Sequence, residues 1–303
     1  MARARPLDGR GGIAPGNGCH CAHVWYAKAH GGRLNRMRKP VVVFLAACLL
    51  AGSLLAFQRG YGNIRRLFPD SEDDSPPAGA QQKTEFYFAR LRYPNVRATG
   101  IWAMRGSWTV DYPKADRQFL QGLIRLTRIH ANPMERVVDL ISDEIFNYPF
   151  VYVVEPGHWD LPEAQAKKLR EFIDRGGFLM TDDFHGTFEW ELFTASLNKA
   201  FADRPIVDIP DDDPIFHVLY DLDHRMQVPG IVNYPFQKTY EYDGIEPKWR
   251  AWRDARGRIA VAICFNMDQG DAWEWADNPH YPEKYASQAY RTAINYILYA
   301  MTH

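Results

Sequence analysis

The chain has 303 residues, a formal net charge of -1 and 14% aromatic residues. A charge this close to zero argues against the basic surface through which proteins bind nucleic acids, and no nucleic-acid partner is expected. Of the four cysteines only Cys264 lies in the C-terminal two thirds, so an internal disulfide is excluded there. Residues 84–303 are long enough to form one domain with a sizeable core.

The N-terminal residues 1–36 are rich in glycine and arginine, and they predict a disordered tail. Met37, directly before the basic and apolar residues that follow, is a candidate for the true start of the protein. Cys19, Cys21 and their neighbouring histidines have the chemistry of metal ligands, but the glycine-rich surroundings favour an unfolded tail over a zinc site.

An apolar segment at 40–57 follows a cluster of basic residues, which is typical of an export signal. Its length is also close to the ~20 residues that cross a membrane as a helix. Three alternatives remain open for residues 37–58: an uncleaved membrane anchor, a signal peptide cleaved near Ala56, and lipidation at Cys48 within a lipobox-like sequence. Residues 59–83 predict a linker, which is acidic and rich in proline and serine from residue 69 onward. We therefore expect residues 84–303 to be extracytoplasmic, on the periplasmic side, and either tethered to the membrane or secreted after cleavage.

Alternation of apolar runs with helical patterns predicts the elements of residues 84–303 in chain order. The expected strands are 85–93, 137–140, 149–155, 177–181, 206–208, 249–253 and 258–265. The expected helices are 115–130, one capped by Asp160 and ended by Gly176, 187–201 and 282–301. This order predicts an α/β domain with a doubly wound, mostly parallel sheet, a C-terminal β-hairpin and a closing helix.

Chemistry in such a sheet is expected in the loops that follow the carboxyl ends of the strands. The turn after the strand at 177–181 holds two adjacent carboxylates and an imidazole, followed by Gly186. We predict Asp183 and His185 as a catalytic acid–base pair, with a metal site built from the two and Glu189 as the other functional interpretation. Asp182 points to the opposite face and either contributes to ligand binding, holds loop amides or caps the next helix. A turn held together by carboxylates for structural reasons alone is the alternative.

Further polar and aromatic side chains in the same set of loops are candidates for ligand binding. With Asp182 they are His158, Trp159, Glu189, Asp271, Trp273 and Glu274. A second acidic loop offers Asp211, Asp212 and His217 as ligands for a divalent metal, whereas Asp213 and Pro214 have the pattern of a helix start. Solvated carboxylates are the alternative for this loop. No other cofactor is expected.

A set of motifs runs through nearly all of residues 84–303. They are the segments 148–152, 161–163, 172–179 (FIDRGGFL) and 182–183, then 213–216, 266–268, 270–274 (GDAWE) and 295–300. In this combination the sequence resembles bacterial domain-of-unknown-function family 4159, which is similar to the class I glutamine-amidotransferase-like superfamily. The resemblance implies a flavodoxin-like arrangement and frequent membrane association, but no activity.

The turn at 182–186 departs from those amidotransferases, which place a nucleophilic cysteine at a strand-to-helix elbow. It contains no cysteine or serine, and Cys264 lies within an expected buried strand, so glutaminase activity is not expected. The first hypothesis is therefore a non-catalytic binding or scaffold module of the bacterial cell envelope, with an envelope protein or a glycan as partner. The alternative is a hydrolase that uses Asp183 and His185, with or without a divalent metal.

Overall fold

The computed structural model describes residues 75–94 and 107–303, which belong to one compact unit of the chain. The strands are β1 (Ala89–Arg92), β2 (Arg136–Asp139), β3 (Phe150–Val154), β4 (Phe178–Asp182), β5 (Val207–Asp208), β6 (Lys248–Arg253) and β7 (Ile259–Phe265). The α-helices in the described part are α3 (Lys114–Leu126), α4 (Glu163–Asp174), α5 (Gly186–Phe201), α6 (Gln269–Glu274) and α7 (Glu283–Thr302).

The strands form one seven-stranded sheet in the order β2-β1-β3-β4-β7-β6-β5. The first five of these strands are parallel, and β6 pairs antiparallel with both β7 and β5. The prediction of a mixed α/β domain with a mostly parallel sheet and a C-terminal hairpin is confirmed. Because the parallel strands run in one direction, the ends of β3, β4 and β7 meet along one edge of the sheet.

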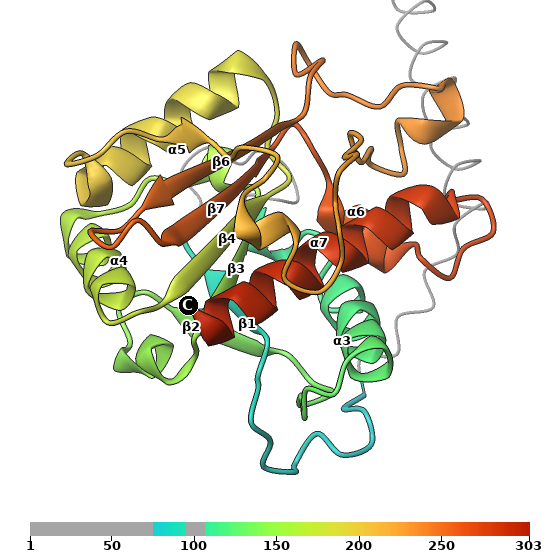
Figure 1. The fold of residues 1–303 in the computed structure, drawn as a ribbon, viewed down its shortest axis with the longest axis horizontal. Helices are drawn as coiled ribbons and strands as arrows, with labels where there is room; N and C mark the ends of the chain where they lie inside the picture. Colours follow the sequence, from blue (N-terminus) through green and yellow to red (C-terminus); the bar gives the residue numbers. More distant parts are fainter. Residues whose placement is uncertain (1–74, 95–106) are drawn as a thin grey trace, which may run out of the picture. The chain divides into compact units, whose positions relative to one another are not determined.

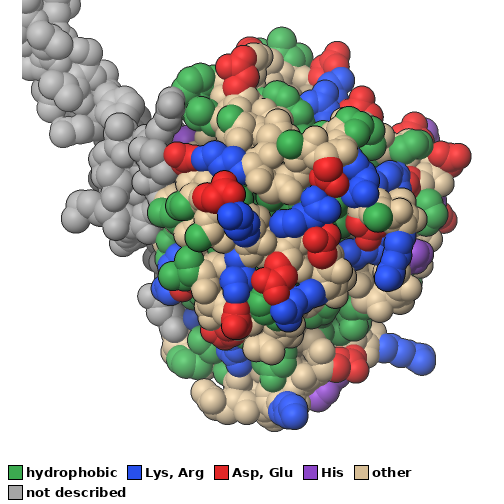
Figure 2. Space-filling model, turned by 90° about the vertical axis from the view of Figure 1, so that its left-hand side faces the viewer, with side chains coloured by type: hydrophobic (Ala, Val, Ile, Leu, Met, Phe, Trp, Pro, Cys, Tyr) green, Lys and Arg blue, Asp and Glu red, His purple; other side chains and the backbone are tan. Residues whose placement is uncertain are grey.

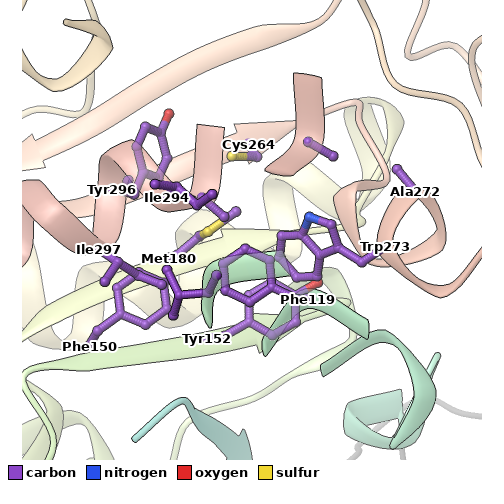
Figure 3. Packing of buried hydrophobic residues seen from close by; sticks show 14 of the residues in the cluster. Phe119, Phe150, Tyr152, Met180, Cys264, Ala272, Trp273, Ile294, Tyr296 and Ile297 are labelled. Carbon is purple, nitrogen blue, oxygen red and sulfur yellow. The ribbon is translucent and has the colours of Figure 1, made fainter. Parts of the chain in front are cut away.

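Helices cover both faces of this sheet, with α3, α6 and α7 on one side and α4 and α5 on the other (Figure 1). Figure 3 shows the core under the first group, where Phe150, Tyr152 and Met180 from the strands pack against Trp273 of α6 and Tyr296 of α7. Strands β3 and β4 are buried on both faces, as their continuous apolar sequences require. The ends of β3 and β4 are therefore supported by apolar packing on both faces of the sheet.

Three local expectations differ from the structure. The first strand is limited to β1, shorter than the 85–93 pattern. The start of α4 is also different, because Pro162 precedes its first residue and Asp160 forms an ion pair with Lys199 instead of capping the helix. Helix α6 was expected as a loop, since six residues are too few to show a helical period.

A buried ion pair ties β1 to α3. The guanidinium of Arg90 donates to both carboxylate oxygens of Asp116, at 2.8 and 2.6 Å, and both side chains are fully buried. Its remaining nitrogen donates to the carbonyls of Trp108 and Val110, at 3.0 and 2.9 Å. Arg90 therefore also holds the segment that leads to Asp111.

The face covered by α4 and α5 carries side chains of both charges, mixed without a large patch of one sign (Figure 2). On α4 this mixture comes from ion pairs four residues apart, Glu163 with Lys167 and Arg170 with Asp174. Such pairs stabilise a solvated helix face by a few tenths of a kcal/mol each. Within the described residues no helix is long and apolar enough to cross a membrane, and the segment 40–57 lies outside them.

Replacing Asp116 with asparagine is expected to lower the free energy of unfolding by about 3 kcal/mol, because Arg90 would keep a buried charge without a partner. Asp139→Asn is the matched control, since it removes the partner of Arg92 from an ion pair that is exposed. The control should cost at most about 1 kcal/mol. Urea denaturation of the full chain measures both values, and equal losses would contradict the special role of the buried pair.

Candidate functional site

The residues directly after β3, β4 and β7 all have a left-handed backbone, although none is glycine. Their φ angles are 45° for Glu155, 56° for Asp183 and 62° for Asn266. A non-glycine residue in this conformation costs about 1–3 kcal/mol, and such residues concentrate at functional sites. Three of them at the ends of neighbouring parallel strands mark this edge of the sheet as the candidate site.

Asp182, the last residue of β4, connects the sheet to α6. Its Oδ2 accepts hydrogen bonds from the amides of Gln269 and Gly270, at 2.8 and 3.1 Å, and from the hydroxyl of Tyr152, at 3.1 Å. The side chain is fully buried, and burial raises its pKa to about 7 despite these donors. Asp182 thus holds backbone amides, which was one of the roles that the sequence allowed.

Asp183 and His185 lie together in the turn between β4 and α5. Nε2 of His185 is 3.1 Å from Oδ1 of Asp183, and His185 is only 4% exposed. Burial lowers the pKa of His185 to about 3, so the imidazole is neutral. Burial, and after it the negative charge of Glu155, raises the pKa of Asp183 well above its ordinary value. The pair therefore combines a neutral imidazole with a buried carboxyl group whose pKa is raised.

Glu189, in the first turn of α5, completes this side of the site. Its Oε2 accepts a hydrogen bond from the amide of His185 at 2.6 Å, and its Oε1 lies 3.6 Å from Nε2 of His158. Burial raises the pKa of Glu189 to about 7. Nδ1 of His158 lies 3.0 Å from Glu155, whose carboxylate raises the pKa of that imidazole. These contacts link the loop after β3 to the turn after β4.

Two further carboxylates, Asp268 and Asp271, lie at the start of α6, after the end of β7. Oδ1 of Asp268 caps the helix by accepting from the amide of Asp271 at 2.8 Å. Asp271 in turn accepts from the amide of Ile231, at 2.6 Å, and from Nε1 of Trp275, at 3.1 Å. Burial, and after it the charges of Asp183 and Asp271, raises the pKa of Asp268 well above its ordinary value. Oxygen atoms of Asp111, Asp268 and Asp271 all lie within 4.8 Å of one another.

The structure places most of the predicted site residues at this edge of the sheet. They are Asp182, Asp183, His185, Glu189, His158, Asp271 and Glu274. The two tryptophans are different: Trp273 is fully buried against Phe119, and Trp159 is 3% exposed and stacks on Phe193. Both rings pack in the core. Trp273 is enclosed there, whereas Trp159 also contributes to the lining of a small pocket beside His158.

The second acidic loop has its own partners. Asp211 pairs with Arg225, while His217 donates from Nε2 to the carbonyl of Asp211 and places Nδ1 3.0 Å from Asp221. Asp212 is exposed. Asp213 accepts from the amide of Ile215 and caps the short turn at Pro214, as expected. Among the described residues the group with metal-ligand spacing is that of Asp111, Asp268 and Asp271, and it includes none of the predicted metal ligands.

The sequence predicts none of four carboxylates found here as site residues: Asp111, Glu155, Glu241 and Asp268. Glu155 and Asp268 do lie in loops that follow strand ends, whereas Asp111 and Glu241 lie outside them. Asp268 had a local signal, because an aspartate three residues before an amide donor is a common helix cap. Asp111 and Glu241 come from segments that precede α3 and β6, and nothing in their local sequence indicates the end of a strand. Only the packing of these segments on α6 brings them to the site.

A cavity of about 550 Å³ lies elsewhere, between α3 and α7, with Gln118, Arg125 and Arg291 in its lining. None of its lining residues belongs to the carboxylate site. It also lacks the strained backbone and the buried ionisable groups found at the strand ends. We therefore place the candidate chemistry at the carboxyl edge of the sheet.

The family model described as "Domain of unknown function (DUF4159)" matches residues 87–301. The chain belongs to this family. The match spans every strand from β1 to β7, so the carboxylate site lies within the DUF4159 domain. No curated protein matches the chain.

The raised pKa of Glu189 predicts a pH dependence of stability. Its value moves from 4.5 to about 7 on folding, so the folded state holds a proton that the unfolded state releases. The stabilisation is complete below about pH 4.5 and is lost as the pH rises through about 7; for this group it amounts to about 3 kcal/mol.

Urea unfolding of the full chain between these pH values measures that loss. Glu189→Gln, which keeps an acceptor for the His185 amide, should flatten the dependence. The exposed Glu163→Gln on α4 serves as the control and should follow the wild-type curve. An unchanged slope in E189Q would show that Glu189 does not titrate in this way.

Proposed function

We propose that this DUF4159 domain is a hydrolase whose acid–base groups are Asp183, His185 and Glu189. The observation that carries the proposal is the contact of 3.1 Å between Asp183 and the neutral, buried His185, on a left-handed turn directly after β4. A strained strand-to-helix turn that presents one reactive side chain is a recurrent device of hydrolases.

Hydrolysis needs one group that removes a proton from the attacking water and another that protonates the leaving group. The raised pKa of Asp183 suits the second role, and His185 holds its carboxyl group in place. Glu189, with a pKa of about 7, is present in both protonation states near neutral pH and suits the first role. Asp182 has a structural role, because its Oδ2 is engaged by α6 and Tyr152.

Asp183→Asn tests this proposal with little risk to the fold, since asparagine tolerates the left-handed backbone at this position. Its hydrolysis of p-nitrophenyl esters, glycosides and phosphates is compared with that of wild type. D183N should cleave the substrate class that wild type cleaves at least about 100-fold more slowly. Asp174→Asn, on the exposed face of α4, is the control and should keep wild-type rates. Equal rates in D183N and wild type would end the proposal.

The strand order supports a further proposal about ancestry. The parallel strands follow the order β2-β1-β3-β4-β7, which corresponds to the 2-1-3-4-5 order of flavodoxin-like sheets. We infer a relationship to the class I glutamine-amidotransferase-like superfamily, with Asp183 at the elbow where those enzymes carry cysteine. Cys264 is buried in β7, and burial raises the pKa of its thiol, so it does not replace that nucleophile.

One observation favours the non-catalytic binding module of the cell envelope as a second candidate. Tyr242 is 69% exposed, and partial desolvation, followed by the charges of Glu189 and Glu241, raises the pKa of its hydroxyl. An open aromatic ring therefore lies near these carboxylates. An aromatic face next to hydrogen-bond acceptors suits a glycan or a protein partner. In this proposal the segment 40–57 tethers the domain outside the cytoplasm or directs its secretion.

Tyr242→Ala separates the two candidates. If the domain binds glycans without cleaving them, calorimetry should detect binding of peptidoglycan fragments by wild type and about fivefold weaker binding by Y242A, because a stacked ring contributes about 1 kcal/mol. Phe236→Ala, another exposed aromatic residue, is the control. Cleavage of the fragments during the titration would instead favour the hydrolase.

A further inference from the structure

Four carboxylates converge where the segment around Gly230 crosses the start of α6. A Cβ atom at Gly230 would lie 2.9 Å from Oδ2 of Asp268, 3.2 Å from Oδ2 of Asp271 and 3.5 Å from Oε1 of Glu241. Asp111 joins them from the segment that Arg90 holds, with its oxygen within 4.8 Å of those of Asp268 and Asp271. Glycine at position 230 leaves open the space that these oxygens surround.

Two buried carboxylate oxygens near the start of α6 have no hydrogen-bond donor. One is Oδ2 of Asp111, which lies 2.4 Å from where a Cβ of Gly270 would be. The other is Oδ1 of Asp182, a fully buried residue whose Oδ2 is held by the amides of Gln269 and Gly270. Buried acceptors without donors are rare in native proteins, because each has lost its water without gaining a hydrogen bond.

Within residues 75–94 and 107–303, no basic side chain forms an ion pair with Asp111, Asp268 or Asp271. The guanidinium of Arg90 is close enough to lower the pKa of Asp111, but it is already paired with Asp116. Neutral amides and an indole donate to Asp268 and Asp271, and Asp271 also contacts the carboxyl groups of Asp268 and Glu274. The cluster therefore has the charge and the acceptors of a cation site, and its own donors do not neutralise it.

We propose that Asp111, Asp268 and Asp271 bind a hard divalent cation of the Ca²⁺, Mn²⁺ or Mg²⁺ class, with Glu241 as a fourth carboxylate at its edge. Oxygen ligands lie about 2.3–2.6 Å from Ca²⁺, so ligands on opposite sides of one ion are at most about 5 Å apart. The spacing of the three oxygens, within 4.8 Å, meets this condition. All-oxygen ligands select hard cations over zinc or copper.

The cation site is independent of the proposed hydrolysis, because neither Asp183 nor His185 is a ligand. It lies apart from the loop with Asp211, Asp212 and His217, for which the sequence predicts a divalent metal. A cation here would lie next to the end of β4 and would reduce the repulsion that Asp111 and Asp268 exert on the neighbouring carboxylates.

Asp111→Asn is the decisive variant, since asparagine keeps the shape and tolerates the left-handed backbone that Asp111 has. The full chain is freed of metal with chelator and titrated with CaCl₂, MnCl₂ or MgCl₂, with heat of binding and thermal midpoint as the readouts. We expect at least one of these ions to bind wild type and to raise its midpoint, and D111N to bind it at least about tenfold more weakly. Without metal, D111N should unfold at a higher temperature than wild type, because one of the repelling charges is gone.

Two further variants complete the test. Asp174→Asn, remote on α4, should bind as wild type does, and Asp183→Asn should also retain binding even if hydrolysis is lost or never observed. Asp212→Asn probes the competing loop: loss of binding there, with D111N unaffected, would overturn the proposal. It is equally overturned if none of the three ions binds wild type, or if D111N binds them as tightly as wild type.

Discussion

The carboxylate of Asp182 is the contact on which the arrangement of the site depends. It ends β4, lies deep in the protein, and joins two strands to a helix through the hydroxyl of Tyr152 and the first amides of α6. A helix of six residues has little stability of its own, so its position comes from this anchor and from the burial of Trp273 beneath it. Once α6 is in place, Asp268 and Asp271 face the segment that Arg90 holds.

Burial and charge oppose each other at the carboxyl edge of the sheet. The apolar core that supports β3 and β4 removes water from the strand ends, and burial accordingly raises the pKa of Asp182, Asp183 and Glu189. Left-handed residues after three strands add backbone strain at the same place. Buried ionisable groups and strained residues lower the stability of the fold, and in proteins they concentrate at functional sites.

The architecture could be predicted because it depends on local patterns. The apolar sequence of β3 fits a strand that is buried on both faces, and Gly176 ends α4 with a φ of 99°, a conformation that glycine adopts readily. The candidate pair Asp183 and His185 also followed from local order, since it stands between a strand and a helix. The sequence also predicts Trp273 as a ligand-binding residue, whereas its ring is buried against Tyr152. In a segment as short as α6, the sequence pattern does not distinguish a tryptophan that faces the core from one that faces a groove.

The sequence by itself determined the order of strands and helices, the parallel sheet with its hairpin, and the turn that carries Asp182, Asp183 and His185. It did so because hydrophobic periodicity and turn residues act over a few neighbouring positions. Only the tertiary structure decided which distant carboxylates join that turn, placing Asp111 and Glu241 with Asp268 and leaving Asp211 and Asp212 apart. Their meeting depends on how the connecting segments pack across the sheet, and that information is spread over the whole core.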